Sequence, residues 1–97
     1  MISAWLVRLE IVRDDGGALS DQQVQELTDV LTANQMAPEL ERGDAGTIRV
    51  QVAVQANNDH AARMAAESVV RQRAYEVWAA HGLPPFTISF VEAIPAE

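Results

Sequence analysis

The side chains in this sequence that could do acid–base chemistry are two histidines and a set of carboxylates. Asp59 directly precedes His60, and a carboxylate beside an imidazole is the pairing of a general base with the group that orients it. We expect Asp59 to cap a helix instead, with His60 exposed in the first turn. His81 is expected in the last turn of the same helix, where the helix dipole favours a protonated imidazole. The two histidines then lie about six turns apart, which excludes a shared metal ion.

Two other segments resemble chemical motifs only in part. Asp14-Asp15-Gly16-Gly17 lacks the alternating oxygen ligands of a calcium loop, and no Lys follows its glycines as in a phosphate-binding loop. Glu39 and Glu41 point the same way from one predicted strand, where charges keep an edge strand from pairing with other chains. The absence of Cys excludes disulfides, thiolate metal sites and Cys nucleophiles. The sequence therefore predicts no catalytic residue, no metal site and no cofactor.

The composition is that of a small acidic protein. The chain has 97 residues, which predicts one domain over 1–97, and a net charge of −7. All seven basic residues are Arg, which together with abundant Ala is typical of a GC-rich bacterial or phage genome. An acidic chain repels nucleic-acid phosphates and anionic membranes, so we expect neither as a partner. We expect a cytoplasmic location, because the start lacks a signal peptide and no apolar stretch reaches the roughly 20 residues of a membrane span.

Hydrophobic periodicity predicts the elements that position these residues. Apolar and polar residues alternate over 2–13, 47–56 and 86–94, which is typical of strands. Ser20 and Gln23 form a capping box that begins a first helix, and the residue before Pro38 ends the helical region.

A second helix is predicted from Asn57-Asn58-Asp59 to about His81, where Gly82 and the prolines after it end it. Residues 38–42 are short and charged and contain a proline, which favours an edge strand joined to 47–56 by a loop at 43–46. The tail 95–97 is expected to fray.

These elements give the order β, α, β, β, α, β and an α+β class. The helices are expected to cover one side of an antiparallel sheet, against core residues that include Trp5 and Trp78. This order resembles the ferredoxin-like superfold, a four-stranded two-layer βαββαβ sandwich, over essentially the whole chain. The resemblance is architectural and implies no residue roles. The alternative drops 38–42 and leaves a three-stranded βαβαβ sheet.

The other side of the predicted sheet is left uncovered by helices. We predict that it is a contact surface for a second copy or a protein partner, since folds of this shape often pair by their open sheets. The predicted interface residues are Leu6, Arg8, Glu10, Val12, Arg49, Gln51, Ser89, Val91 and Ala93.

Families of this shape can be compared with the chain at particular positions. Acylphosphatases use an Arg-bearing loop after the first strand, where this sequence has Asp14-Asp15-Gly16-Gly17. RNA-recognition domains carry aromatic residues on the two central strands of the open face, where this sequence has charged and amide side chains. Regulatory amino-acid-binding domains keep a glycine at the first strand–helix loop, a place that Gly16 or Gly17 could take.

The leading functional hypothesis is a non-enzymatic assembly domain that forms a homodimer or binds a protein partner through its open sheet. A small-molecule-binding regulatory domain, with a ligand cleft near Gly16-Gly17, is the first alternative. A cofactor-independent enzyme similar to the dimeric antibiotic-synthesis-type monooxygenases is the second, and it would need a polar pocket between helices and sheet.

Overall fold

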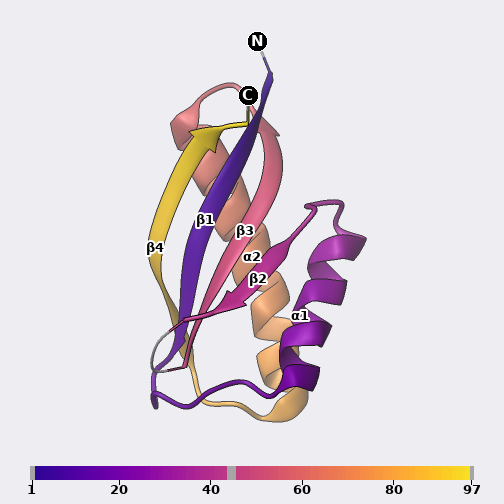
Figure 1. The fold of residues 1–97 in the computed structure, drawn as a ribbon, viewed down its shortest axis with the longest axis vertical. Helices are drawn as coiled ribbons and strands as arrows, with labels where there is room; N and C mark the ends of the chain where they lie inside the picture. Colours follow the sequence, from indigo (N-terminus) through magenta and orange to yellow (C-terminus); the bar gives the residue numbers. More distant parts are fainter. Residues whose placement is uncertain (1, 44–45, 97) are drawn as a thin grey trace.

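The computed structural model describes residues 2–43 and 46–96, with the elements in the order expected from the sequence. The predicted loop at 43–46 and the tail at 95–97 therefore lie partly outside the described residues. Figure 1 shows the elements, which are β1 (Ser3–Arg13), α1 (Asp21–Ala33), β2 (Glu39–Arg42), β3 (Thr47–Ala56), α2 (Asp59–His81) and β4 (Phe86–Pro95).

The described strands form one antiparallel sheet in the order β2-β3-β1-β4. The long strands β1 and β3 are central, as expected, and they pair from Ser3 and Ala56 to Val12 and Thr47. Strand β2 pairs with β3 from Glu39 opposite Gln51 to Arg42 opposite Ile48. The predicted edge hairpin is thus confirmed, and the three-stranded alternative is wrong.

Both helices lie on one side of the sheet, and α2 crosses behind it in Figure 1. Helix α2 packs against β1, β3 and β4, whereas α1 packs against α2 and β2. Fully buried alanines at 62, 66 and 74 let α2 approach the strands closely. The apolar core between the layers is made by Val7, Leu9, Ile11, Leu19, Leu27, Leu31, Met36, Ile48, Val50, Val52, Val70, Val77 and Trp78.

The helix ends follow from local hydrogen bonding. Ser20 accepts from the Gln23 amide at 3.2 Å, and the Gln23 side chain accepts from the Ser20 amide at 2.9 Å. Asn58, rather than Asp59, caps α2 by accepting from the Ala61 amide at 2.8 Å. Gly82 ends α2 with φ 61°, a left-handed conformation that favours glycine. No helix among the described residues is long and apolar enough to cross a bilayer.

Replacing Ser20 with Ala is expected to lower the free energy of unfolding by about 0.5–2 kcal/mol, because both halves of the capping box are lost. Chemical denaturation monitored by circular dichroism measures the change. Ser3→Ala is the matched control, since Ser3 is exposed at the start of β1, and it should change the free energy by less than about 0.5 kcal/mol. Equal effects of the two substitutions would contradict a stabilising cap.

Candidate functional site

The candidate site is the face of the sheet that points away from the helices. Val7, Leu9 and Ile11 of β1 are buried toward the helices, so the residues between them point to the opposite side. No described element packs on that side. We call it the open face, and its central β1 residues are Leu6, Arg8, Glu10 and Val12.

Cross-strand pairing arranges the open face in rows. In the first row, Leu6 lies between Ala53 of β3 and Ile94 of β4. In the second, Arg8 lies between Gln51 and Glu92. Glu10 pairs with Arg49 in the third row, and Val12 lies between two threonines, Thr47 and Thr87, in the fourth.

A β-bulge in β4 corrects the predicted membership of this face. Ile88 pairs with Ile11 and Phe90 with Glu10, so β4 has one extra residue, Ser89, at this point. Beyond the bulge the alternation of β4 is shifted by one residue. Val91 then pairs with Leu9, on the side of the helices.

The prediction that Val91 and Ala93 lie on the open face is therefore wrong. Ala93 pairs with Val7, and both residues are partly buried against the core. Ser89 is exposed at the bulge itself, outside the regular rows. Glu92 and Ile94 take the open-face positions on β4, and the sequence interpretation had not named them as interface residues.

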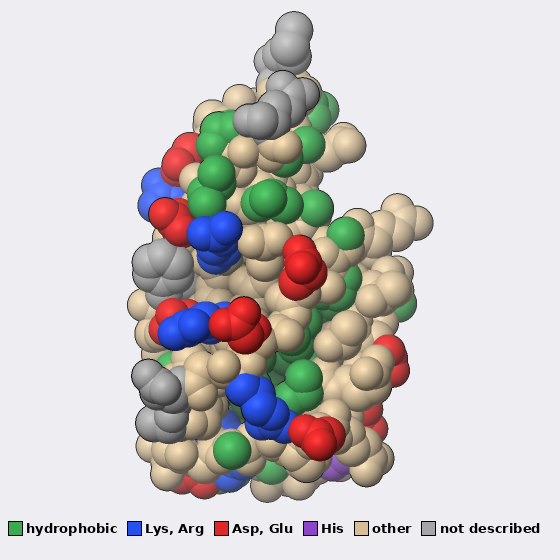
Figure 2. All heavy atoms as spheres, viewed as in Figure 1, with side chains coloured by type: hydrophobic (Ala, Val, Ile, Leu, Met, Phe, Trp, Pro, Cys, Tyr) green, Lys and Arg blue, Asp and Glu red, His purple; other side chains and the backbone are tan. Residues whose placement is uncertain are grey.

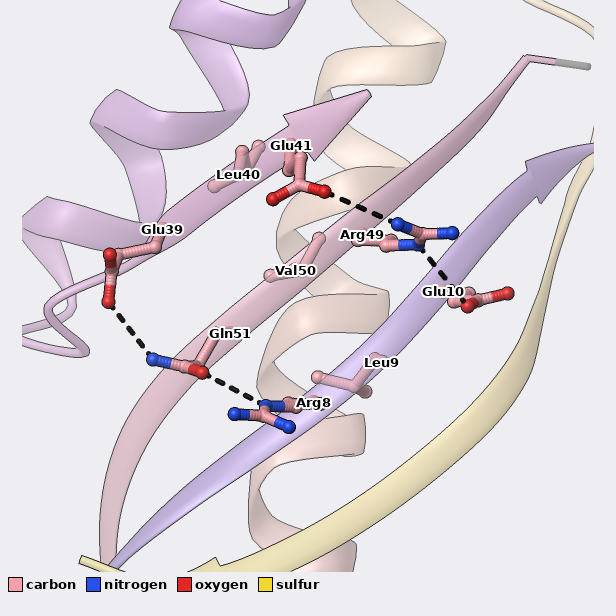
Figure 3. Close-up of a pocket in the computed structure, with 9 residues that line it drawn as sticks. All are labelled: Arg8, Leu9, Glu10, Glu39, Leu40, Glu41, Arg49, Val50 and Gln51. Atoms are coloured by element: carbon pink, nitrogen blue, oxygen red, sulfur yellow. Dashed lines mark hydrogen bonds and ion pairs between the residues drawn. The ribbon is translucent and has the colours of Figure 1, made fainter. Parts of the chain in front are cut away.

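Two chains of polar contacts cross the open face, as Figure 3 shows. In one, Arg8 Nε donates to the Gln51 amide oxygen at 3.1 Å, and the Gln51 amide nitrogen donates to Glu39 at 3.0 Å. In the other, Arg49 Nη1 lies 3.3 Å from a Glu41 oxygen and Arg49 Nε lies 3.7 Å from a Glu10 oxygen. Glu39 and Glu41 thus complete contacts that begin on the central strand.

These polar side chains line a shallow groove of about 400 Å³ over β1, β2 and β3. The Arg49 and Glu41 side chains are 54% and 73% exposed, and ion pairs this exposed contribute little to folding stability. Among residues 2–43 and 46–96, Arg8 donates to a neutral amide and forms no ion pair with a carboxylate, so its charge is available to a partner. The groove offers charged groups of both signs for recognition.

An apolar patch adjoins the groove. We define it as Leu6, Ala53 and Ile94, the three residues of the first row, all of which are only partly buried. Figure 2 views the open face and shows green side chains gathered over its upper half, with charged groups beside and below them. The patch and the groove together give the face an apolar part and a polar part.

The residues considered for acid–base chemistry are dispersed. His60 is exposed, and Asp59 pairs with Arg63 one turn along α2 at 2.8 Å rather than with the imidazole. His81 contacts Glu26 of α1, which links the C-terminal end of α2 to the middle of α1. Among the described residues, no group of three His, Cys, Asp or Glu side chains is placed to hold a metal ion.

The loop after β1 is held by contacts within the chain. Arg13 binds Asp15 through both Nε and Nη2, at 3.0 and 2.7 Å, and donates to the Ala18 carbonyl at 3.0 Å. The Arg13 guanidinium lowers the pKa of Asp15, helped by the Gly17 amide. A Cβ on Gly17 would lie 2.9 Å from this guanidinium, so the Arg13 side chain fills the space beside Gly17, whereas the space beside Gly16 is open.

The two tryptophans lie on the core side, as predicted. Trp78 is buried against Phe86 with ring centroids 4.9 Å apart. Trp5 is partly buried and donates through Nε1 to the Ala56 carbonyl at 3.2 Å. In the part of the chain that the structure describes, the groove over β1, β2 and β3 and the hollow beside β3 have no lining residue from α2, and the hollows along α2 have none from the sheet.

No protein-family model, no curated protein and no solved structure matches this chain.

Proposed function

We propose that this chain is a ferredoxin-like, non-enzymatic assembly domain that pairs with a second copy of itself through the open face of its sheet. The observation that carries the proposal is the first row of that face. Leu6, Ala53 and Ile94 form a patch on a side that no described element covers. Pairing two open faces would remove each patch from water, at about 25 cal/mol for each Å² of apolar surface.

The available area supports a specific contact. Strands of about ten residues are roughly 33 Å long, and neighbouring strands lie about 4.8 Å apart. Two such faces in contact would bury about 1,000 Å² in total, which is the lower end for specific interfaces. The homodimer is therefore expected at micromolar concentrations.

The order of side chains along β1 suits a two-fold contact. Arg8 and Glu10 stand on the same face, one on each side of Leu9. A two-fold axis across the strand at Leu9 sets Arg8 opposite the partner's Glu10, and the reverse contact follows by symmetry. The same axis sets Leu6 opposite the partner's Val12.

Leu6→Arg is expected to shift the protein toward monomer while the fold is kept, because it places an unpaired charge in the apolar patch. Sedimentation velocity at micromolar concentrations should show at least about a tenfold weaker association. Gln22→Arg adds the same charge at an exposed position of α1 and should leave the mass unchanged. A wild-type dimer that persists in Leu6→Arg would place the contact elsewhere and overturn the proposal.

A further inference from the structure

The outer side of α2 carries two large apolar side chains that the open-face proposal does not use. Met64 is 56% exposed and Tyr75 is 68% exposed, which makes them two of the most exposed large hydrophobic residues described. They are eleven positions apart in the sequence, about three helical turns, so they stand on one line of the helix. Glu67, Ser68 and Arg71 lie between them and line a shallow hollow.

We propose that this line of α2 is a second self-association surface, on which α2 packs antiparallel to α2 of another copy. The centre of the contact lies between Val69 and Val70. Met64 and Tyr75 are equally far from this centre, so each Met64 meets the partner's Tyr75 at both ends of the contact. Ser68, next to the centre, is small enough to let the two helices approach.

The chemistry of the facing residues favours this arrangement. A methionine sulfur against an aromatic ring is a favourable contact, and the antiparallel pair makes it twice. Glu67 and Arg71 are joined within the chain at 2.8 Å and stand on the same flank of the helix. In the antiparallel pair each Glu67 also approaches the partner's Arg71.

A parallel pair would lose these contacts. It would place each Met64 against the partner's Met64 and each Arg71 against the partner's Arg71, so that like charges would face one another. A second copy of the chain is therefore the occupant, and its orientation is fixed by the same residues.

This contact is smaller than the one proposed for the sheet. Helix α2 has 23 residues and is about 35 Å long. One helix against another buries less than the roughly 1,000 Å² of a stable interface, so we expect association in the range of about 100 μM.

The two surfaces lie on opposite layers of the domain, because α2 is behind the sheet when the open face is in front (Figure 1). One contact therefore does not block the other. If both form, the wild-type protein exceeds the mass of a dimer at high concentration.

The test is carried out in a Leu6→Arg background, which removes the open-face contact. Met64→Lys and Tyr75→Glu are added separately, and each should abolish the remaining dimer at about 500 μM in sedimentation velocity. An equimolar mixture of the two variants should regain a heterodimer. One end then pairs the introduced lysine with the introduced glutamate, and the other keeps the native methionine and tyrosine.

The outcomes separate this proposal from the preceding one. The α2 contact would be overturned if the Leu6→Arg protein were monomeric at about 500 μM. It would also be overturned if the dimer persisted in both Met64→Lys and Tyr75→Glu. A mixture that stays monomeric would overturn the antiparallel register. If Leu6→Arg leaves the dimer of the wild-type protein intact but Met64→Lys dissociates it, the open-face proposal fails and the α2 contact stands. Circular dichroism establishes that each variant is folded, and Ile94→Arg replaces Leu6→Arg if that variant unfolds.

Discussion

Replacing Leu27 with Ala is expected to lower the free energy of unfolding by about 2–5 kcal/mol, one of the largest losses that a single truncation can cause in this chain. Leu27 is fully buried, so its truncation both reduces the apolar surface that folding buries and leaves a cavity. The position is sensitive because α1 is attached to the domain only through α2 and β2 among the described elements. Urea denaturation with two spectroscopic probes measures the change and tests two-state behaviour.

Gln22→Ala is the matched control on the same helix. Gln22 is exposed near the start of α1, and its truncation leaves no cavity. We expect a change of less than about 0.5 kcal/mol. If Leu27→Ala were as mild as this control, α1 would not contribute a packed face to the core.

The order of elements was predictable from the sequence because each element carries its own local signal. Residues that alternate in hydrophobicity define β1 and β3, and hydrogen-bonding side chains mark the start of each helix. The short strand β2 was predictable from its charges and from the proline just before it, which suit an edge. These signals depend on neighbours in the sequence, so no knowledge of long-range contacts was needed.

The bulge in β4 was not predictable in the same way. Phe86, Ile88 and Phe90 form an alternating apolar set, and Val91 and Ala93 form a second set in the opposite phase. A pattern that is apolar in both phases is compatible with either face, and only pairing with β1 selects one. The adjacent pair Phe90-Val91 marks the change of phase, but adjacent apolar residues also occur in strands that are regular.

The candidate site was predictable only as a list of residues on β1 and β3. Arg8 and Glu10 share a face of β1, and Arg49 and Gln51 share a face of β3, because strands alternate. The apolar residues between them place both pairs on the side away from the core. Which of them touch depends on the pairing of β3 with β1 and β2. A shift of two residues would keep both pairs on the open face but separate Arg49 from Glu10, and no local signal in the sequence excludes such a shift.

Val91→Arg is expected to destabilise the fold by several kcal/mol, because the bulge turns this side chain toward the helices. Val91 pairs with Leu9, which is 1% exposed, and packs against the same core. Because Val91 is partly buried, a guanidinium at this place loses part of its contact with water and disturbs the packing of the core, without gaining a partner of opposite charge. Thermal denaturation at low protein concentration, where association is negligible, should show a large fall in Tm.

Ile94→Arg is the matched variant on the same strand, with the opposite expectation. Ile94 pairs with Leu6 on the open face, so the introduced charge points to solvent and the Tm should change little. Its effect should appear instead in sedimentation at micromolar concentrations, as a loss of dimer. The two substitutions lie on one strand and differ in the face that each side chain takes. The pair therefore separates an effect on folding from an effect on association. If Val91→Arg kept the wild-type Tm while Ile94→Arg unfolded the protein, the alternation of β4 beyond Ser89 would be the reverse of the one described, and the apolar patch would belong to the core.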